Sequence, residues 1–291
     1  MAAALLAIIV CFSVVFFSTV TFVVNGYLLF AIFVTKKITH NHELSLFYAR
    51  FAIDMMFSVA DATYAICLLT RFLNSPVILP MIQVFTSLVL TQNFMSMRAL
   101  LVVIITFDRV LAVYTPIKYM VNRKKLSNFL ILLPVVGYWA FDNFVLWGFC
   151  GYTLVYPDGC YNFGCLFNDC YANYWLGYEQ ATYVVHGLLS LLMFIKLFIW
   201  NNCTGKKSNA TISKANRFAL IDIFIVAFFD FIPTVIYAAN VDYVYDQVGP
   251  ANGMMKALGY AIEGCMIAKV LMRNNNVRHS SVMVSGGTGK V

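Results

Sequence analysis

The stretch LLAIIVCFSVVFFSTVTFVV, residues Leu5 to Val24, contains no charged residue and decides the class of the fold. An α-helix rises about 1.5 Å per residue, so about 20 apolar residues span the hydrocarbon core of a bilayer. A transmembrane β-barrel would instead show segments of about ten residues in which apolar and polar residues alternate. The stretch therefore predicts a membrane-spanning α-helix.

The composition of the whole chain agrees with this prediction. Hydrophobic residues make up 61% of the 291 residues, charged residues only 11%, and the mean hydropathy is +0.78. A soluble domain is about half apolar and a quarter charged, and a soluble fold with the present composition would expose large apolar surfaces. An aromatic content of 16% is too high for a disordered chain. Soluble, disordered and fibrous proteins are therefore excluded.

Apolar blocks of membrane-spanning length recur along the chain. We place helices at residues 3–35, 43–70, 79–114, 126–149, 174–200, 217–240 and 251–273. Residues 1–273 then form one transmembrane domain, and residues 274–291 a short polar tail that we expect to lack regular structure. The predicted fold class is an all-α membrane protein, a seven-transmembrane helix bundle. Since the first block starts at residue 3, we expect any ligand to bind within the bundle.

The basic residues predict the orientation of the bundle. Lys and Arg cluster in the loops after the first, third and fifth helices and in the tail, whereas the other loops have Arg71 as their only basic residue. Basic loops face the cytoplasm, so we expect an extracellular N-terminus and a cytoplasmic C-terminus. The excess of 20 Lys and Arg over 13 Asp and Glu is then a signal of membrane topology. The lipid bilayer is an expected partner of the chain, and nucleic acid is not.

Four of the eight cysteines lie in the predicted extracellular loop after the fourth helix: Cys150, Cys160, Cys165 and Cys170. Disulfides persist on the oxidising side of the membrane, and four cysteines allow three sets of pairings. The alternative is a zinc site, because the last three follow a C-x4-C-x4-C spacing. We prefer disulfides and expect neither a metal nor a cofactor.

Charged side chains inside the predicted helices are candidates for function, because each costs several kcal/mol in a bilayer unless it is paired or hydrated. Asp54 and Arg98 should lie at similar depth in the second and third helices, and we expect them to form a buried ion pair. This pair either fixes the helix register or belongs to a switch. Deeper charges in the last two helices, Asp230, Lys256 and Glu263, either line a cavity or satisfy one another.

The sequence contains no HExxH, P-loop or G-x-S-x-G motif, so we do not expect an enzyme. It also lacks the internal repeat that is typical of transporters. The intramembrane residues Asp54, Arg98 and Glu263 nevertheless allow an ion path, and a membrane transporter or ion channel is the main alternative function. A retinal-binding photoreceptor is a further alternative, for which Lys256 in the last helix would have to form the Schiff base.

The most specific motif is FDRVLAVYTPIKY, residues Phe107 to Tyr119, at the cytoplasmic end of the third helix. Its Asp108, Arg109 and Pro116 resemble the D-R-Y-x5-P pattern of rhodopsin-like G-protein-coupled receptors. The resemblance implies that Arg109, like the arginine of that superfamily, exchanges its neighbouring aspartate for carbonyl groups of an inserted G-protein helix. Such an exchange is a two-state element that a ligand can bias.

Other positions match this superfamily in part. Asn25 and Asp54 are similar to the polar markers of its first two helices, and Pro233 occupies the place of the kink in its sixth helix. Phe231 stands where tryptophan is usual, and the last helix has KALGYAIEG instead of an Asn-Pro-x-x-Tyr motif. An Asp-Arg pair without that last motif resembles the nematode serpentine chemoreceptors, and within them serpentine receptor class bc.

The resemblance implies a multi-pass plasma-membrane receptor in the cilium of a sensory neuron, which binds a small environmental ligand in the outer half of the bundle and activates a heterotrimeric G protein. Asp108, Arg109 and Pro116 would then form the coupling site. The intramembrane switch would comprise Asn25, Asp54, Arg98, Asp230, Phe231, Pro233 and Glu263. We expect the ligand to contact Gln92, Asn93, Glu179, Tyr183, Tyr237 and Lys256. A pocket with many aromatic and few charged residues suits a small apolar or weakly polar ligand.

Overall fold

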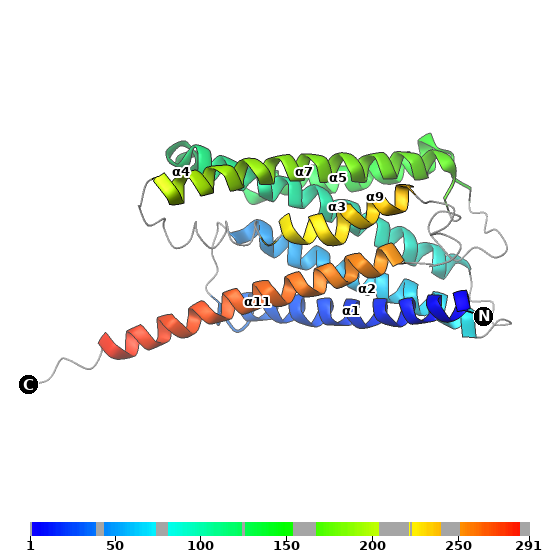
Figure 1. Cartoon of the computed structure of the whole chain (residues 1–291), viewed down its shortest axis with the longest axis horizontal. Helices are drawn as coiled ribbons and strands as arrows, with labels where there is room; N and C mark the ends of the chain where they lie inside the picture. Colours follow the sequence, from blue (N-terminus) through cyan, green and yellow to red (C-terminus); the bar gives the residue numbers. More distant parts are fainter. Residues whose placement is uncertain are drawn as a thin grey trace, which may run out of the picture.

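The structure, a computed structural model, describes residues 2–38, 44–73, 81–123, 126–153, 167–203, 221, 223–239 and 251–285. Its elements are α1 (Ala2–Phe33), α2 (Ser45–Leu73), α3 (Met81–Tyr114), α4 (Pro116–Arg123), α5 (Asn128–Phe144), the π-helical segment η2 (Val145–Phe149), α7 (Asp169–Cys203), the π-helical segment η3 (Val226–Phe231), α9 (Ile232–Ala239) and α11 (Ala251–Ser285) (Figure 1). The described residues form helices and contain no strand.

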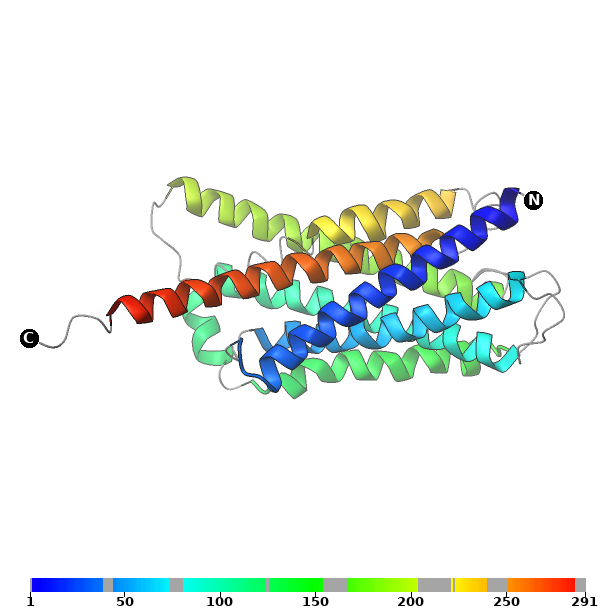
Figure 2. The same ribbon diagram turned by 90° about the horizontal axis from the view of Figure 1, so that it is seen from below.

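The long helices form one bundle with α3 near its centre. α1 packs against α2 and α11, α2 packs against α3, and α3 also contacts α5 and α7. α1 begins at one end of the bundle, and α11 ends beyond the opposite end, as two perpendicular views show (Figure 1, Figure 2). This arrangement agrees with an odd number of membrane crossings, in which the two ends of the chain lie on opposite sides.

Within the described residues, four helices are by length and composition able to cross a membrane: Leu5–Phe33, Ser45–Thr70, Asn128–Phe149 and Asp169–Ile199. A shorter apolar helix covers Ile223–Ile236. α3 and α11, with 34 and 35 residues, exceed the length that a bilayer requires. Together these elements correspond to the seven predicted segments.

One helix start and one additional helix have a clear local cause. α7 begins at Asp169 rather than at residue 174, because the Asn168 side chain accepts a hydrogen bond from the backbone N–H of Tyr171 at 3.1 Å and caps the helix. The short helix α4 was not predicted; it begins at Pro116, a residue well suited to the first turn because it has no N–H to leave unpaired.

The prediction for the tail was wrong as far as Ser285. We ended the last helix at residue 273, whereas α11 continues to Ser285 and projects from the bundle (Figure 1). No Gly or Pro occurs between Gly264 and Gly286, so no strong helix breaker interrupts this polar stretch. Ser285 is the last residue of the chain that the structure describes.

Two apolar clusters enclose a polar layer. The first, on α1, α2, α3 and α11, includes Phe47, Phe51, Leu101 and Ile267, and the second, nearer the outer end, includes Tyr64, Leu68, Val145, Tyr171 and Trp175. On α2, Asp54 lies between Phe51 of the first cluster and Tyr64 of the second. On α3, Arg98 lies between Met95, which packs against the second cluster, and Leu101 of the first. The charges near the middle of α2 and α3 therefore lie between two apolar clusters.

A glycine sets the distance between α11 and η3. A Cβ atom added at Gly259 would lie 2.6 Å from Phe229 Cβ, which is inside van der Waals contact. Small residues at helix interfaces allow such close approach in membrane bundles. Gly259 thus positions the polar side chains that follow it on α11 against the sixth helix.

Candidate functional site

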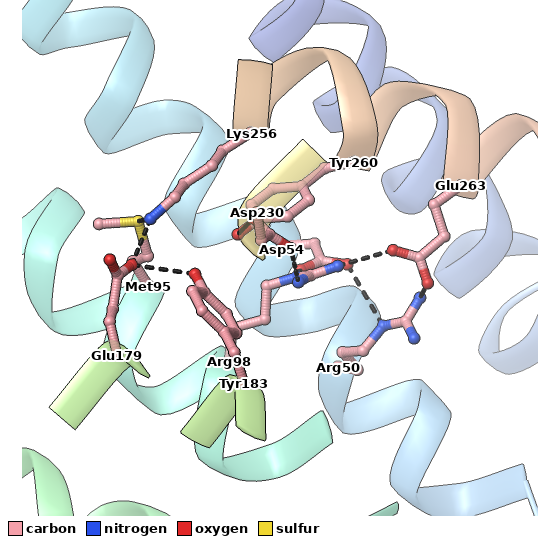
Figure 3. Close-up of polar contacts among 10 residues, drawn as sticks. All are labelled: Arg50, Asp54, Met95, Arg98, Glu179, Tyr183, Asp230, Lys256, Tyr260 and Glu263. Atoms are coloured by element: carbon pink, nitrogen blue, oxygen red, sulfur yellow. Dashed lines mark hydrogen bonds and ion pairs between the residues drawn. The ribbon is translucent and has the colours of Figure 1, made fainter. Parts of the chain in front are cut away.

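Arg98 on α3 is the centre of a buried charge network. Its Nε donates to Asp54 Oδ1 at 2.7 Å, and its Nη2 donates to Glu263 Oε2 at 2.6 Å (Figure 3). Its Nη1 lies 3.8 Å from Asp230 Oδ2. The guanidinium therefore connects α2, α3, η3 and α11, and the Asp54–Arg98 pair expected from the sequence is present.

Arg50 completes this network, and the sequence analysis missed it. Its Nη2 forms an ion pair with Glu263 Oε1, and its Nε lies 3.5 Å from Asp54 Oδ2. We call Arg50, Asp54, Arg98, Asp230 and Glu263 the polar hub; each side chain is at most 3% exposed. The spacing of Arg50 and Asp54, four residues apart on one helix, was the available signal.

Tyr260 covers the hub and was also missed. The Arg98 Cζ atom lies 3.6 Å from the centre of the Tyr260 ring, a cation–π contact. The Tyr260 hydroxyl donates to Asp230 Oδ1 at 3.4 Å. Tyr260 therefore holds the carboxylate of the sixth helix beside the guanidinium of the third.

A second ion pair lies nearer the outer end of the bundle. Lys256 Nζ pairs with Glu179 Oε1 on α7 and contacts Met95 Sδ at 3.2 Å. The Tyr183 hydroxyl donates to the same glutamate oxygen at 3.0 Å. The expectation that Lys256, Asp230 and Glu263 satisfy one another was therefore wrong for the lysine, because its ion-pair partner is a residue of α7.

A small cavity lies between the polar hub and this outer pair. It has a volume of about 10 Å³, room for about one water molecule. Its lining includes Arg98, Tyr183, His186, Asp230 and Tyr260, contributed by α3, α7, η3 and α11. Two residues predicted for different roles, Tyr183 for ligand and Asp230 for the switch, thus face one space.

The sixth helix changes its geometry beside this cavity. In η3 the backbone N–H of Ile232 donates to Ala227 O, a π-helical bond that spans one residue more than in an α-helix. Pro233 comes next in the chain and has no N–H, so the helix also lacks one backbone hydrogen bond there. Asp230 and Phe231 both lie in η3, and the Phe231 ring meets the Tyr183 ring edge-on at 6.4 Å.

The Asp-Arg motif at the other end of α3 is engaged by α4. Arg109 Nε donates to Asp108 Oδ2 at 3.1 Å and its Nη2 to the Tyr119 hydroxyl at 2.8 Å. The Tyr119 hydroxyl donates to Asp108 Oδ2 at 2.9 Å, and Arg123 Nε donates to Asp108 Oδ1 at 3.1 Å. Burial raises the pKa of Tyr119 to about 12. We call these four residues the cytoplasmic cluster.

Pro116 is the first residue of α4, the helix that carries Tyr119 and Arg123. Its contribution to the cluster is therefore indirect. Arg123 was interpreted as a topology signal only, whereas its side chain is buried, and it also donates to Asn128 Oδ1 at 2.6 Å. Arg123 is 15 residues from Asp108 in the sequence, and the sequence alone does not show that α4 brings the two side chains together.

The comparisons with known proteins agree with this architecture. The family model described as serpentine type 7TM GPCR chemoreceptor Srbc matches residues 3–275. The chain belongs to the Srbc chemoreceptor family. The resemblance to class bc found in the sequence is thereby confirmed, and the family is one of receptors rather than enzymes. A search of the curated proteins finds no match.

In this Srbc chain the outer loop is linked to the bundle by a disulfide between Cys150, after η2, and Cys170 in α7. Asn168 adds a hydrogen bond from its Nδ2 to the Cys150 carbonyl at 2.9 Å. Cys160 and Cys165 lie outside the described residues. Two of the three pairings left open by the sequence are thus excluded.

The remaining predicted residues of the Srbc chain lie at separate places. Asn93 exchanges hydrogen bonds with Asn143 of α5 at 3.4 and 3.2 Å. Gln92 is buried, and Asn25 donates to Thr21 O of its own helix at 3.0 Å. The side chain at Tyr237 lies outside the described residues. The proposed ligand contacts that cluster in space are therefore Glu179, Tyr183 and Lys256.

Proposed function

We propose that this protein is a chemosensory receptor of the plasma membrane of sensory cilia. It binds a small environmental ligand inside the helix bundle and activates a heterotrimeric G protein. Membership of the Srbc family supports the receptor class. The observation that carries the coupling step is the cytoplasmic cluster, in which Arg109 is held by Asp108 and Tyr119 at the end of α3.

The cluster corresponds to an uncoupled state. Arg109 can bind an incoming G-protein segment only after it leaves Asp108 and the Tyr119 hydroxyl. Hydrogen bonds to charged groups contribute about 1.5–3 kcal/mol each, so the engaged arginine is a stable resting state. Arg123 lowers the cost of release, because it remains paired with Asp108 after Arg109 has left. A difference of a few kcal/mol is the range in which a ligand can shift two conformations.

The sixth helix is the proposed link between ligand and cluster. Asp230 lines the cavity, and Phe231 contacts Tyr183, which also lines it. Both residues belong to η3, which is followed by Pro233. A π-helical segment next to a proline is a point where a helix bends easily. A ligand that alters the contacts of η3 would thus change the angle between α9 and the residues before η3, where Ile223 packs against Val110 and Val113 near the cluster.

The test is a screen of volatile and soluble odorants for calcium or second-messenger signals in cells that express the chain. Arg109→Ala is the paired variant, and surface expression is measured for both. We expect some odorant to give a response that is lost in the variant at equal surface expression. A strong response that the variant leaves unchanged would overturn the proposed role of the cluster.

A transporter or ion channel is the second candidate, because the polar hub brings charged residues of four elements together inside the bundle. Flux of ions or odorants into liposomes that contain the purified chain would favour this candidate. The retinal alternative has a similarly direct test, since Lys256 as a Schiff base would give a visible absorption band after incubation with retinal. We expect neither flux nor a visible band.

A further inference from the structure

Asp230 presents an unused acceptor to the cavity. Its Oδ1 accepts from the Tyr260 hydroxyl, whereas its Oδ2 has no hydrogen-bond donor among the residues that the structure describes. The nearest cationic nitrogen, Arg98 Nη1, is 3.8 Å away, which is beyond hydrogen-bonding distance. Asp230 is only 1% exposed, so bulk water does not satisfy this oxygen.

His186 presents a second acceptor. Thr106 Oγ1 donates its single proton to Val102 O at 2.9 Å, and the same oxygen lies 3.1 Å from His186 Nδ1. In the tautomer that satisfies both contacts of Thr106, the imidazole donates from Nδ1, and Nε2 is then an unprotonated acceptor in the neutral ring. Nε2 also lacks a partner among the described residues, and His186 is 3% exposed. Both acceptors belong to residues that line the cavity.

The charge around the cavity is negative. The polar hub contains two guanidinium groups, Arg50 and Arg98, and three carboxylates, Asp54, Asp230 and Glu263. The nearby Lys256–Glu179 pair is neutral in sum. One more positive charge would balance the hub, whereas a carboxylate ligand would add to an existing excess of negative charge.

The size and the walls of the cavity suit a cationic nitrogen. The space of about 10 Å³ holds one water molecule, and a primary ammonium group has nearly the size of water. Tyr183 provides an aromatic ring in the lining, which attracts cations, whereas the Tyr260 ring already faces Arg98. Both tyrosine hydroxyls already donate to carboxylates, so they offer no further proton to an anionic or neutral acceptor.

We propose that this cavity anchors the head group of a cationic ligand, a small protonated primary amine whose N–H groups donate to Asp230 Oδ2 and His186 Nε2. The inference rests on the proposed receptor function and specifies its ligand class. It replaces the sequence expectation of an apolar or weakly polar ligand.

The test measures binding without any G protein. The full-length chain in lipid nanodiscs is heated with a series of straight-chain alkylammonium ions and with the alcohols and carboxylates of the same chain length. We expect ammonium ions of suitable length to raise the unfolding temperature and the matched alcohols and carboxylates to leave it unchanged. Stabilisation by carboxylates or alcohols in preference to ammonium ions, or by none of the three classes, would overturn the proposal.

Two variants locate the site. Asp230→Asn removes the charge and His186→Phe removes the second acceptor; each should weaken ammonium binding about tenfold to a hundredfold, the range for a hydrogen bond to a charged group. The matched control is Asp142→Asn, which removes another buried carboxylate, bonded to Tyr171 and outside the cavity. Unchanged ammonium affinity in a folded His186→Phe variant would contradict the site even if Asp230→Asn failed to fold.

The two proposals can fail separately. Ammonium binding that depends on Asp230, without any odorant-driven signal in cells, supports the site and counts against the receptor function. Odorant signals that require Arg109, without ammonium binding, support the receptor function and overturn the amine site.

Discussion

Replacing Arg98 with methionine should destabilise the protein more than any single carboxylate replacement in the polar hub. Arg98→Met retains the length of the side chain but leaves three carboxylates with Arg50 as their only guanidinium. Glu263→Gln instead leaves two guanidinium groups with two carboxylates, which balances the charge. The direction of the comparison follows from this asymmetry.

The magnitudes follow from burial, because the hub side chains are at most 3% exposed. Removing one partner of a buried ion pair costs about 3–5 kcal/mol, so Arg98→Met should lower the free energy of unfolding by about that amount. Glu263→Gln loses charge-assisted hydrogen bonds but leaves equal numbers of positive and negative groups in the hub, so it should cost about 1–3 kcal/mol. In the double variant the lost interactions overlap, so its cost should be about 1–3 kcal/mol smaller than the sum of the two single costs.

The assay is the thermal unfolding of the purified chain in nanodiscs for the wild type, both single variants and the double variant. At about 2–4 °C per kcal/mol, Arg98→Met should lower Tm by about 6–20 °C. Asp142→Asn serves as a control that is outside the hub. A shift for Arg98→Met no larger than that for Glu263→Gln, or full additivity in the double variant, would refute the reasoning.

Three further outcomes are expected from thermal unfolding. Cys170→Ser, or a reductant, should lower the free energy of unfolding by about 3 kcal/mol, because the disulfide closes a loop of about 20 residues; no change on reduction would argue against this link. Gly259→Ala should cost about 1–3 kcal/mol, because the new Cβ would lie 2.6 Å from Phe229 Cβ, whereas Gly187→Ala, with nothing within 4 Å, should cost nothing. Since burial raises the pKa of Tyr119 to about 12, its contribution to stability should be complete below about pH 10 and be lost as pH rises toward 12. Tyr119→Phe should make the decline in stability over this range smaller, and an identical decline in the variant would contradict this role.

The helical bundle could be predicted because its signal is local. Each apolar block contains its own length information, and the Asp-Arg motif lies within one helix end. Asp54 and Arg98 could be paired from depth alone, since both lie on adjacent helices of defined length. These inferences require only the rise of a helix and the thickness of a bilayer.

The partners that were missed depend on geometry between distant segments. Arg50 reaches Glu263 only because α2 and α11 are neighbours, and depth alone does not predict which helices are adjacent. Arg123 reaches Asp108 because Pro116 starts a helix in a loop with no expected structure. Lys256 pairs with Glu179 rather than with a hub carboxylate because of how α7 and α11 face each other.

The most direct test of the central claim is the rate of GTPγS exchange on heterotrimeric G proteins by the reconstituted chain, measured without ligand. Asp108→Asn weakens the hold on Arg109, and the account predicts that it raises basal exchange above the wild type. Adding Arg109→Ala to that variant should return exchange to the level of empty nanodiscs. Exchange that stays high in the double variant would contradict coupling through Arg109.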